Sequence, residues 1–470
     1  MADSILGLPT SAKYQAAGDR FNAHRRQILN IAPNGGSPLT ALLSMIPSEP
    51  LTDSIYYWYE KRFKVAQAAL RGTDPVTTTA PTDGDKDDGT AVTATSVAIT
   101  TALYIKVDTT RDLHTGQILI PDTNHDILFR IKTIVRGAAD EATKGYIVVN
   151  LQRATTLASI STTFAAGTIL RVTGSTYGEG QTGVGVTGSG VKRPYRIENT
   201  TQIFRDSFSF PGTVLQMGLK YDQTGPYKQK ARDTVLDHFV GIERSILFGK
   251  RATITRNSFD SNQEDLTTRT FSGILEFLKL WDAGSTGLTV DGATYAPYSF
   301  KAESSVDSDD EKRFITNATG DFTVKDFDVW TERACRYRSN KSPSKLMLVG
   351  SGASLALTEM FRRNGTFQVE AGKTAYGLSL KTLVTPSGNF EIVTHPLFND
   401  DPVLRYSALI VDIWDIKLRP LQGRDTQLLP NRQNPGDDLR KDEYLSELGL
   451  EVHAPERHMF IKNLRNYKVA

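Results

Sequence analysis

Histidine and cysteine are the residue types that would first indicate metal or nucleophilic chemistry, and their spacing in this sequence argues against it. The seven histidines are scattered, and the closest two, His453 and His458, lie five residues apart without a nearby cysteine or third ligand. A zinc site needs three or four such groups held together. The single cysteine, Cys335, excludes an intrachain disulfide, and we expect it to be buried and structural. We therefore predict no metal site.

One glycine-rich segment has the letters of a nucleotide-binding fingerprint. Gly183, Gly185 and Gly188 have the spacing G-x-G-x-x-G, but a phosphate-binding loop must follow a buried strand and open a helix. Because this segment lies among glycines and threonines, a flexible linker is the better interpretation. No Walker motif, nucleophile elbow or His-Glu-x-x-His sequence occurs. We predict no catalytic residue and no cofactor; a hydrolase with a β-rich accessory domain stays an alternative, because carboxylate pairs leave no spacing signature.

The charge balance indicates neither a nucleic acid nor a membrane as partner. The chain has 55 basic and 53 acidic side chains, a formal net charge of +2. Its short basic clusters, among them Arg193 with Arg196, are expected to be solvated surface or subunit contacts. No apolar run approaches the roughly 20 residues that span a bilayer, and no secretory signal is readable. We predict no sequence-specific nucleic-acid binding, no membrane insertion, and synthesis in the cytoplasm.

An aromatic run is the strongest candidate for contact with another protein. It consists of Tyr56, Tyr57, Trp58 and Tyr59, within a predicted strand at residues 55–63. Aromatic side chains of this kind contribute much of the binding energy at protein interfaces. Two of the four could instead face the core of this subunit, and both interpretations stay open.

The first half of the chain predicts an arm followed by a hairpin that carries an insertion. Residues 1–55 contain proline and glycine breaks and a brief helix at 38–43, as expected of an arm that does not fold alone and lies on another part of the protein or its neighbour. Two tracts poor in large apolar residues, 73–90 and 174–190, bracket short alternating runs. These runs, at residues 91–172, predict an all-β module inserted into a longer hairpin.

The second half predicts a mixed α+β domain organised by a long helix. This helix is expected from Pro226 to Gly249, with His238 as a polar neighbour off its apolar stripe. The predicted stripe is Tyr227, Ala231, Val235, Phe239, Ile242 and Ile246. A capping pair, Thr323 and Asp326, precedes a helix whose predicted buried residues are Phe327, Trp330, Ala334 and Tyr337. The other predicted elements are helices at 274–281 and 354–361, and strands at 346–349, 380–384, 390–394, 409–416, 444–452 and 458–464.

Several motifs follow one another in an order that resembles a known family. They are Pro38-Leu39-Thr40, Trp58-x-Glu60, Asn199-Thr200-Thr201-Gln202-Ile203-Phe204, Pro211-Gly212-Thr213, Ile242-Glu243-Arg244 to Gly249, and Tyr444 to Glu451. Together they resemble the major capsid proteins of tailed bacteriophages, which have the HK97-like fold. The resemblance implies a structural subunit that self-assembles into the icosahedral head around a DNA genome. A phage tail or surface-adhesion protein is a second alternative, although it predicts repeated β modules, and only one is present.

The resemblance also implies a division of the chain and a set of partners. Residues 1–55 would be the N-terminal arm, 56–198 the extended loop with the inserted module, and 199–320 the peripheral domain with the spine helix at about 226–248. Residues 321–430 would be the axial domain, and 431–470 the closing strands. The expected partners are copies of the chain in hexamers and pentamers, with a separate scaffolding protein, a portal and decoration proteins. The expected location is the virion, after synthesis in the host bacterial cytoplasm. Some members of the family cross-link a Lys to an Asn of a neighbour with help from a Glu, but no such trio can be aligned in this sequence, so covalent cross-linking is not predicted.

Overall fold

The computed structural model describes Leu39, Leu43 and most of residues 49–468. The gaps within that range are 62–66, 72–75, 78–79, 81–101, 109, 111–112, 137–144, 153–165, 180–193, 217–224, 255–266, 285–286, 291–292, 299–311, 338–343, 365–367, 371–373, 376–377 and 380. The Gly183 to Gly188 motif and Arg193 fall in one of these gaps. In the part of the chain that is described, no helix is long and apolar enough to cross a membrane.

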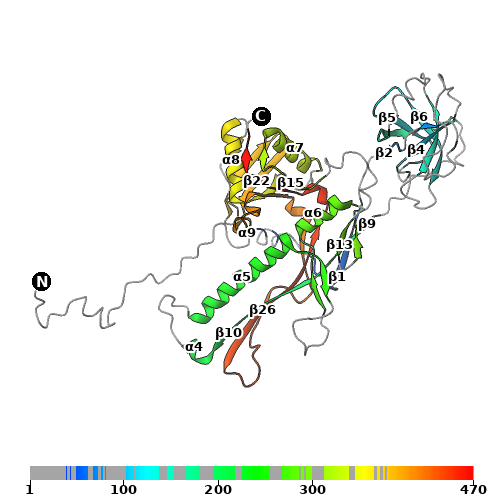
Figure 1. The fold of residues 1–470 in the computed structure, drawn as a ribbon. Helices are drawn as coiled ribbons and strands as arrows, with labels where there is room; N and C mark the ends of the chain where they lie inside the picture. Colours follow the sequence, from blue (N-terminus) through cyan, green and yellow to red (C-terminus); the bar gives the residue numbers. More distant parts are fainter. Residues whose placement is uncertain are drawn as a thin grey trace, which may run out of the picture.

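A long helix lying along an antiparallel sheet forms the frame of the subunit (Figure 1). The helix α5 (Pro226–Phe248) has the predicted bounds, with proline in its first turn and Gly249 at its end. The sheet consists of β10 (Gln202–Pro211), β26 (Leu439–Val452), β24 (Ile416–Pro420) and β25 (Gln427–Leu429). Because β26 pairs with all three other strands, it is the centre of this sheet.

The buried face of α5 differs from the predicted apolar stripe. Of that stripe only Ile242 and Ile246 are buried, whereas the four earlier members are half-buried. The buried residues are Thr234, His238, Ile242, Glu243, Ile246 and Leu247. The helix is rotated toward its polar flank because the sheet offers hydrogen-bond partners to His238, and such pairing removes the cost of burying a polar group. The prediction that His238 lies off the buried face was therefore wrong.

A second, seven-stranded sheet is buried on both faces. Its strand order is β15-β27-β23-β17-β22-β21-β18. The central strand β17 (Ser344–Val349) is parallel to β22 (Gly388–Thr394) and antiparallel to β23 (Ala408–Val411). One face joins the cluster around α5 and α6 (Ile274–Ala283). The other face packs on α7 (Val324–Cys335) and α8 (Ser351–Asn364). Because the strands are thus buried on both faces, their sequences are continuous apolar runs. The remaining strands are β15 (Phe314–Thr316), β27 (Met459–Lys462), β21 (Lys381–Thr385) and β18 (Gln368–Glu370).

Three details of this region test the sequence predictions. The capping box of Thr323 and Asp326 is confirmed, and Phe327, Trp330 and Ala334 are buried. Tyr337 lies past the end of α7 and is 46% exposed, so it does not belong to the buried stripe. The predicted strand at 409–416 is two strands in different sheets, because Asp412 caps a 3-10 turn (Ile413–Asp415) that turns the chain from β23 into β24. Likewise, β26 and β27 belong to different sheets.

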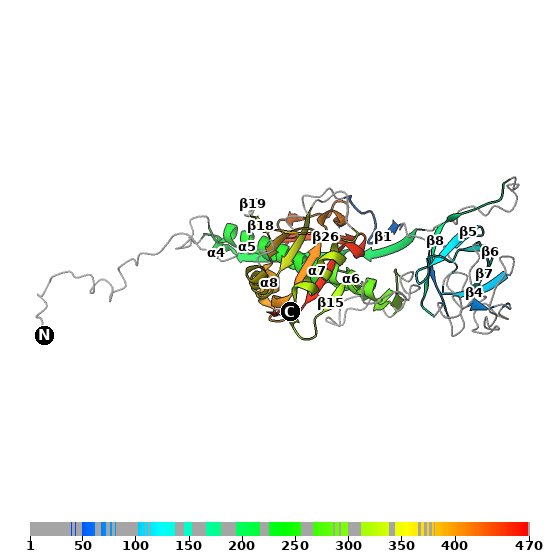
Figure 2. The same cartoon turned by 90° about the horizontal axis from the view of Figure 1, so that it is seen from above.

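The β module forms a separate antiparallel sheet at the far end of the hairpin (Figure 1, Figure 2). Its strand order is β2-β8-β5-β6-β7-β4-β3, and its buried apolar residues form a cluster of their own. The sheet begins at β2 (Gln67–Ala69), includes β3 (Val76–Thr77) and ends with β8 (Ile169–Ser175). Strands therefore lie outside the predicted limits of 91–172, and the buried Val76 and Thr77 come from the tract predicted as a linker. The other strands are β4 (Ala102–Val107), β5 (Gln117–Pro121), β6 (Phe129–Arg136) and β7 (Gly145–Leu151).

Candidate inter-subunit contact site

The aromatic run lies on a two-stranded hairpin that separates it into two faces. The strand β1 (Ile55–Glu60) pairs antiparallel with β9 (Tyr195–Thr200). Tyr56 and Trp58 are 7% exposed, whereas Tyr57 and Tyr59 are 57% and 59% exposed. Because successive side chains of a strand point to opposite sides, one pair packs on the subunit and the other faces outward. Tyr56 and Trp58 thus belong to this subunit's own core, as the second interpretation of the run expected.

The outward side carries a compact group that we call the hairpin face, defined as Ile55, Tyr57, Tyr59 and Arg196. The rings of Tyr57 and Tyr59 meet edge to face with centroids 5.7 Å apart. The Arg196 guanidinium lies 5.8 Å from the centre of the Tyr57 ring and its side chain is 61% exposed. Ile55 is 49% exposed. Aromatic and arginine side chains in this arrangement are the types enriched at the centres of protein interfaces.

The inward side attaches the hairpin to the subunit at several points. The Trp58 ring packs against Phe277 and His453, with centroids 5.8 and 5.9 Å away. The Glu60 carboxylate accepts hydrogen bonds from the Trp58 indole N–H (3.3 Å) and the Ala454 backbone N–H (3.0 Å). The Tyr56 hydroxyl donates to the Leu450 carbonyl at 2.7 Å, and burial raises the pKa of Tyr56 well above its usual value. The inward side of the hairpin therefore packs on the subunit, and its outward side is exposed.

The backbone edge of β9 is closed by a tyrosine side chain. The Tyr295 hydroxyl accepts a hydrogen bond from the Glu198 backbone N–H (2.9 Å) and donates to the Glu198 carbonyl (3.0 Å). Burial raises the pKa of Tyr295 to about 12, so this hydroxyl stays protonated and can make both bonds. Arg251 lies 5.1 Å from the Tyr295 ring centre and pairs with the Glu198 carboxylate at 3.0 Å. At this position the strand edge is satisfied within the subunit, which leaves the side chains of the hairpin face for contacts.

An Asp-His-Ser chain resembles the arrangement of a hydrolase triad, but its histidine and serine are buried. His238 Nδ1 lies 2.6 Å from the Asp206 carboxylate, and Nε2 lies 2.7 Å from the Ser446 hydroxyl. A catalytic serine must reach a substrate carbonyl. Ser446 is fully buried, and its hydroxyl also bonds with the Thr426 hydroxyl at 2.8 Å. The chain of bonds therefore ties α5 to the sheet instead of forming an active site.

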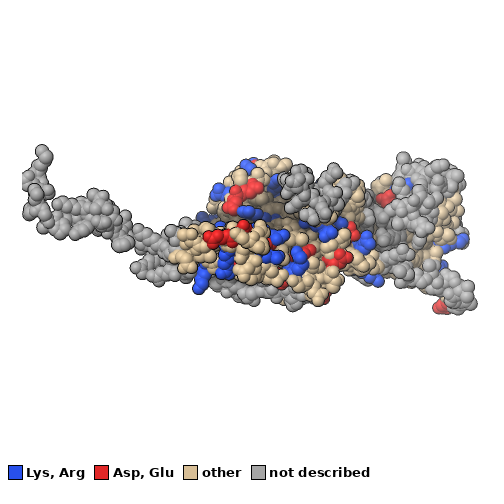
Figure 3. Space-filling view, turned by 90° about the horizontal axis from the view of Figure 1, so that it is seen from below, with Lys and Arg blue, Asp and Glu red and all other residues tan. Residues whose placement is uncertain are grey.

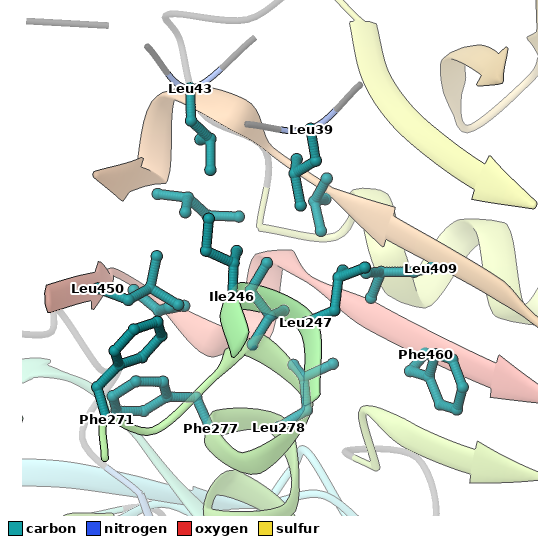
Figure 4. Close-up of a cluster of buried hydrophobic side chains, with 14 of the residues drawn as sticks. Leu39, Leu43, Ile246, Leu247, Phe271, Phe277, Leu278, Leu409, Leu450 and Phe460 are labelled. Atoms are coloured by element: carbon teal, nitrogen blue, oxygen red, sulfur yellow. The ribbon is translucent and has the colours of Figure 1, made fainter. Parts of the chain in front are cut away.

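A buried polar group joins Leu39 to α5. The Glu243 carboxylate Oε1 accepts from the Leu39 backbone N–H (3.0 Å) and lies 2.5 Å from His395 Nε2. His395 Nδ1 accepts from the Leu397 N–H, so Nε2 is the ring nitrogen that carries the proton toward Glu243. Leu39 and Leu43 point into the same apolar cluster as Ile246 and Leu247 (Figure 4). Leu39 and Leu43 are thus part of the core of this subunit.

The remaining candidates from the sequence do not assemble into a chemical site. Cys335 is half-buried at the end of α7 and forms no disulfide. Within the described residues no three histidine, cysteine, aspartate or glutamate side chains are placed to hold a metal. On the surface of α8, Arg363 pairs with Glu359 one turn earlier in the helix. On the face shown in Figure 3, basic and acidic side chains are interspersed.

Three buried residues that contact the hairpin or Leu39, namely Glu243, Asn199 and Gly449, carry little signal in the sequence. Glu243 gave no signal beyond its place in the helix. Asn199 stands in the Asn-x-Thr-Gln-Ile-Phe motif, whose sequence indicates the family resemblance but not the contacts of its first residue. Gly449 lies inside a predicted strand, where a glycine often marks the close approach of another group, and this signal could have been used.

A family model matches nearly the whole chain. The SU10 major capsid protein family matches residues 10–465, and no curated protein matches. A solved chain of Mycobacterium phage Bobi is 7% identical, with 97% of this chain and 99% of that chain covered and a TM-score of 0.40. For Mycobacterium phage Adephagia the values are 9%, 99%, 99% and 0.39. For the SrpI encapsulin of Synechococcus elongatus they are 11%, 60%, 80% and 0.36. Since these TM-scores lie below 0.5, the assignment rests on the family match: the chain belongs to the SU10 major capsid protein family and is a structural subunit of a viral capsid.

Proposed function

We propose that the hairpin face binds a neighbouring copy of the chain and that the resulting shell is closed by hexamers and pentamers. The observation that carries this proposal is the division of one short strand into two aromatic faces. Tyr56 and Trp58 hold the strand on its own subunit, while Tyr57 and Tyr59 stay more than half exposed beside Arg196. Exposed aromatic side chains on a rigid support lose little conformational entropy on binding, which favours their use as anchors. Arg193, which directly precedes Pro194 in the sequence, is proposed to contribute to the same contact.

We also propose roles for the segments of the subunit. Residues 1–55 act as the arm, 56–198 as the extended loop, 199–320 as the peripheral domain with α5 as its spine, 321–430 as the axial domain, and 431–470 as closing strands. Support comes from the α+β architecture, in which α5 lies along one sheet while α7 and α8 cover the second. The β module is proposed to lie on the outside of the shell, which encloses a DNA genome.

The partners other than copies of the chain are proposed from the capsid family alone. A separate scaffolding protein, a portal and decoration proteins would complete the head, and the subunit would be made in the cytoplasm of the bacterial host. None of these partners is needed for the hairpin contact itself. The contact can therefore be tested with purified subunits, with a scaffolding protein added if assembly requires one.

The test is assembly of a variant that lacks both exposed rings, Tyr57→Ser with Tyr59→Ser. We expect a folded subunit with an unchanged circular dichroism spectrum, because both rings are outside the core, and a loss of shells in negative-stain images. The matched control is Tyr177→Ser, since Tyr177 is 39% exposed and lies beyond β8 on the module. Shells that form at the wild-type rate from the double variant would show that the hairpin face is not an assembly contact.

A further inference from the structure

Two side chains at the base of the hairpin donate to one backbone carbonyl. Tyr56 lies directly opposite Asn199 in the β1–β9 pair. The Tyr56 hydroxyl and the Asn199 amide nitrogen each donate to the Leu450 carbonyl oxygen at 2.7 Å. A carbonyl oxygen has two lone pairs, so these two bonds use its full capacity. The strand β10 pairs with β26 only as far as Leu448, and the hairpin side chains bond to β26 just beyond that point.

Asn199 also connects the hairpin to the loop before α6. Its amide nitrogen donates to the Ser272 carbonyl (3.2 Å), and its side-chain oxygen accepts from the Ser272 N–H (2.9 Å). The side chain is fully buried, so loss of any of these bonds would leave an unsatisfied polar group. One amide thus joins β9, β26 and the segment that leads into α6.

The two residues that follow Asn199 are held as well. The Thr200 hydroxyl donates to the Thr270 carbonyl (2.9 Å), and the Thr201 hydroxyl donates to the Glu447 carboxylate (3.0 Å). The Thr201 backbone N–H donates to the Ser54 carbonyl (2.8 Å). Since the chain passes from β9 to β10 at Thr201, these bonds fix the turn between the hairpin and the sheet.

A glycine makes room for the tyrosine at this base. A Cβ added to Gly449 would collide with the Tyr56 hydroxyl and lie 2.6 Å from ring carbon Cε1 and 2.8 Å from Cζ. Real Cβ atoms do not approach other atoms this closely, so the ring would have to move. The missing side chain of Gly449 is therefore a notch in β26 into which the end of the Tyr56 ring fits.

We infer that Tyr56, Asn199 and Gly449, which we call the hairpin root, are positioning residues that set the direction in which the hairpin leaves the subunit. The inference rests on the proposed role of the hairpin face. A hairpin that leaves at a fixed angle presents Tyr57, Tyr59 and Arg196 in one place before a neighbour binds. Such preorganisation lowers the ordering cost of each contact, and a shell repeats that contact in every subunit.

The experiment measures the hairpin direction in unassembled subunits by a spin-label distance. The labels are attached to the cysteines of a Lys61→Cys and Leu236→Cys variant in which Cys335→Ser removes the native thiol. Lys61 is exposed at the end of β1, and Leu236 is 48% exposed on α5. We compare the parent with Gly449→Ala and with Gly241→Ala. The latter is a matched control, because an added Cβ at Gly241 has no atom within 4 Å.

We expect Gly449→Ala to displace or broaden the distance distribution and to slow shell assembly, while Gly241→Ala leaves both unchanged. Tyr56→Leu removes the ring atoms that collide with the added Cβ. In the double variant Tyr56→Leu with Gly449→Ala, the distribution should therefore return toward that of Tyr56→Leu alone. A lost contact that affected only stability would not produce this recovery.

An unchanged distribution in folded Gly449→Ala would overturn the inference. If Gly449→Ala does not fold, Asn199→Ser serves instead, and it should broaden the distribution by removing the bonds to Leu450 and Ser272. A wild-type distribution in that variant would also overturn the inference. The distance is measured before assembly, so failure of the root is distinguishable from failure of the hairpin face, which is tested by Tyr57→Ser with Tyr59→Ser.

Discussion

At the scale of single residues, burial and two hydrogen-bond partners hold His458 as a neutral ring. His458 is fully buried; its Nδ1 accepts from the Asp412 backbone N–H, and its Nε2 lies 3.1 Å from the His453 carbonyl. This pairing suits the neutral ring, with one accepting and one donating nitrogen. Burial, followed by the nearby Lys345 ammonium, lowers the pKa of His458 to about 3. Lys345 itself donates to the Ala334 and Arg457 carbonyls, both at 2.6 Å, and burial lowers its pKa to about 8.

The lowered pKa of His458 predicts a loss of stability in mild acid. Between pH 6.5 and about 3 the unfolded chain binds a proton at His458 and the folded chain does not, so unfolding becomes more favourable as the pH falls. The contribution is fully present above pH 6.5 and decreases by on the order of 1.4 kcal/mol per pH unit below it, or about 2 kcal/mol at pH 5. We expect His458→Asn to flatten this part of the profile. Urea unfolding of both proteins from pH 7.5 to 4.5 measures it; parallel profiles would contradict the assignment.

At the scale of single elements, the two halves of α5 differ in how deeply they are buried. Its first half is mostly half-buried, and Tyr227, which donates to Asp442, and His238 attach it to the sheet. Its second half contributes Ile242, Ile246 and Leu247 to the central apolar cluster, where Leu39 and Leu43 also lie. Since burial of apolar area provides most of the stabilisation of a packed helix, the second half should dominate.

This inequality predicts opposite results for two truncations on the same helix. Ile246→Ala removes a fully buried side chain and should lower the free energy of unfolding by about 2–5 kcal/mol, because it leaves a cavity in the central cluster. Leu236→Ala removes a side chain that is 48% exposed and should change it by no more than about 0.5 kcal/mol. Chemical denaturation of the unassembled subunit measures both. Equal effects would mean that the helix is not held chiefly by its second half.

At the scale of the whole molecule, the described residues divide into a body and a module. The body has two apolar clusters on the two faces of the seven-stranded sheet around β17, and one of them includes α5. The module has its own cluster, drawn only from residues between Ala68 and Leu170. The two parts are joined through the β1–β9 hairpin (Figure 1). The inward side of this hairpin contacts the body at the hairpin root.

The separate cluster predicts that the module and the body fold independently. We expect residues 67–175 expressed alone to give a cooperative thermal transition with a β-type circular dichroism spectrum. The remaining chain, with a short Gly/Ser link in place of those residues, should keep the unfolding free energy of the body. Deletion of residues 91–172 is the control, because it removes β4 to β7 and the first part of β8 but leaves β2 and β3 behind. An unfolded module together with an aggregated body would show that the β region belongs to one common core.

The sequence by itself determined the features that depend on neighbouring residues. The limits of α5 follow from Pro226 and Gly249, the start of α7 follows from the Thr323 capping box, and short alternating runs indicated an all-β module. The ordered motifs also led to the capsid family, which the match over residues 10–465 confirms. Local periodicity, the residues at helix ends and the order of motifs carry these signals. None of them depends on contact with a distant segment.

Only the tertiary structure decided which side of each element is buried and what it contacts. A strand must place Tyr56 and Trp58 on one side and Tyr57 and Tyr59 on the other, but the sequence does not say which pair is buried. Contacts with Leu450 and Gly449 on β26 determine that Tyr56 faces inward. His238 is buried because Asp206 and Ser446 supply its partners, and Glu243 is buried because Leu39, 204 residues away, and His395 do so. A polar side chain can leave water only where such a partner is present, and folding alone brings partners from distant segments together.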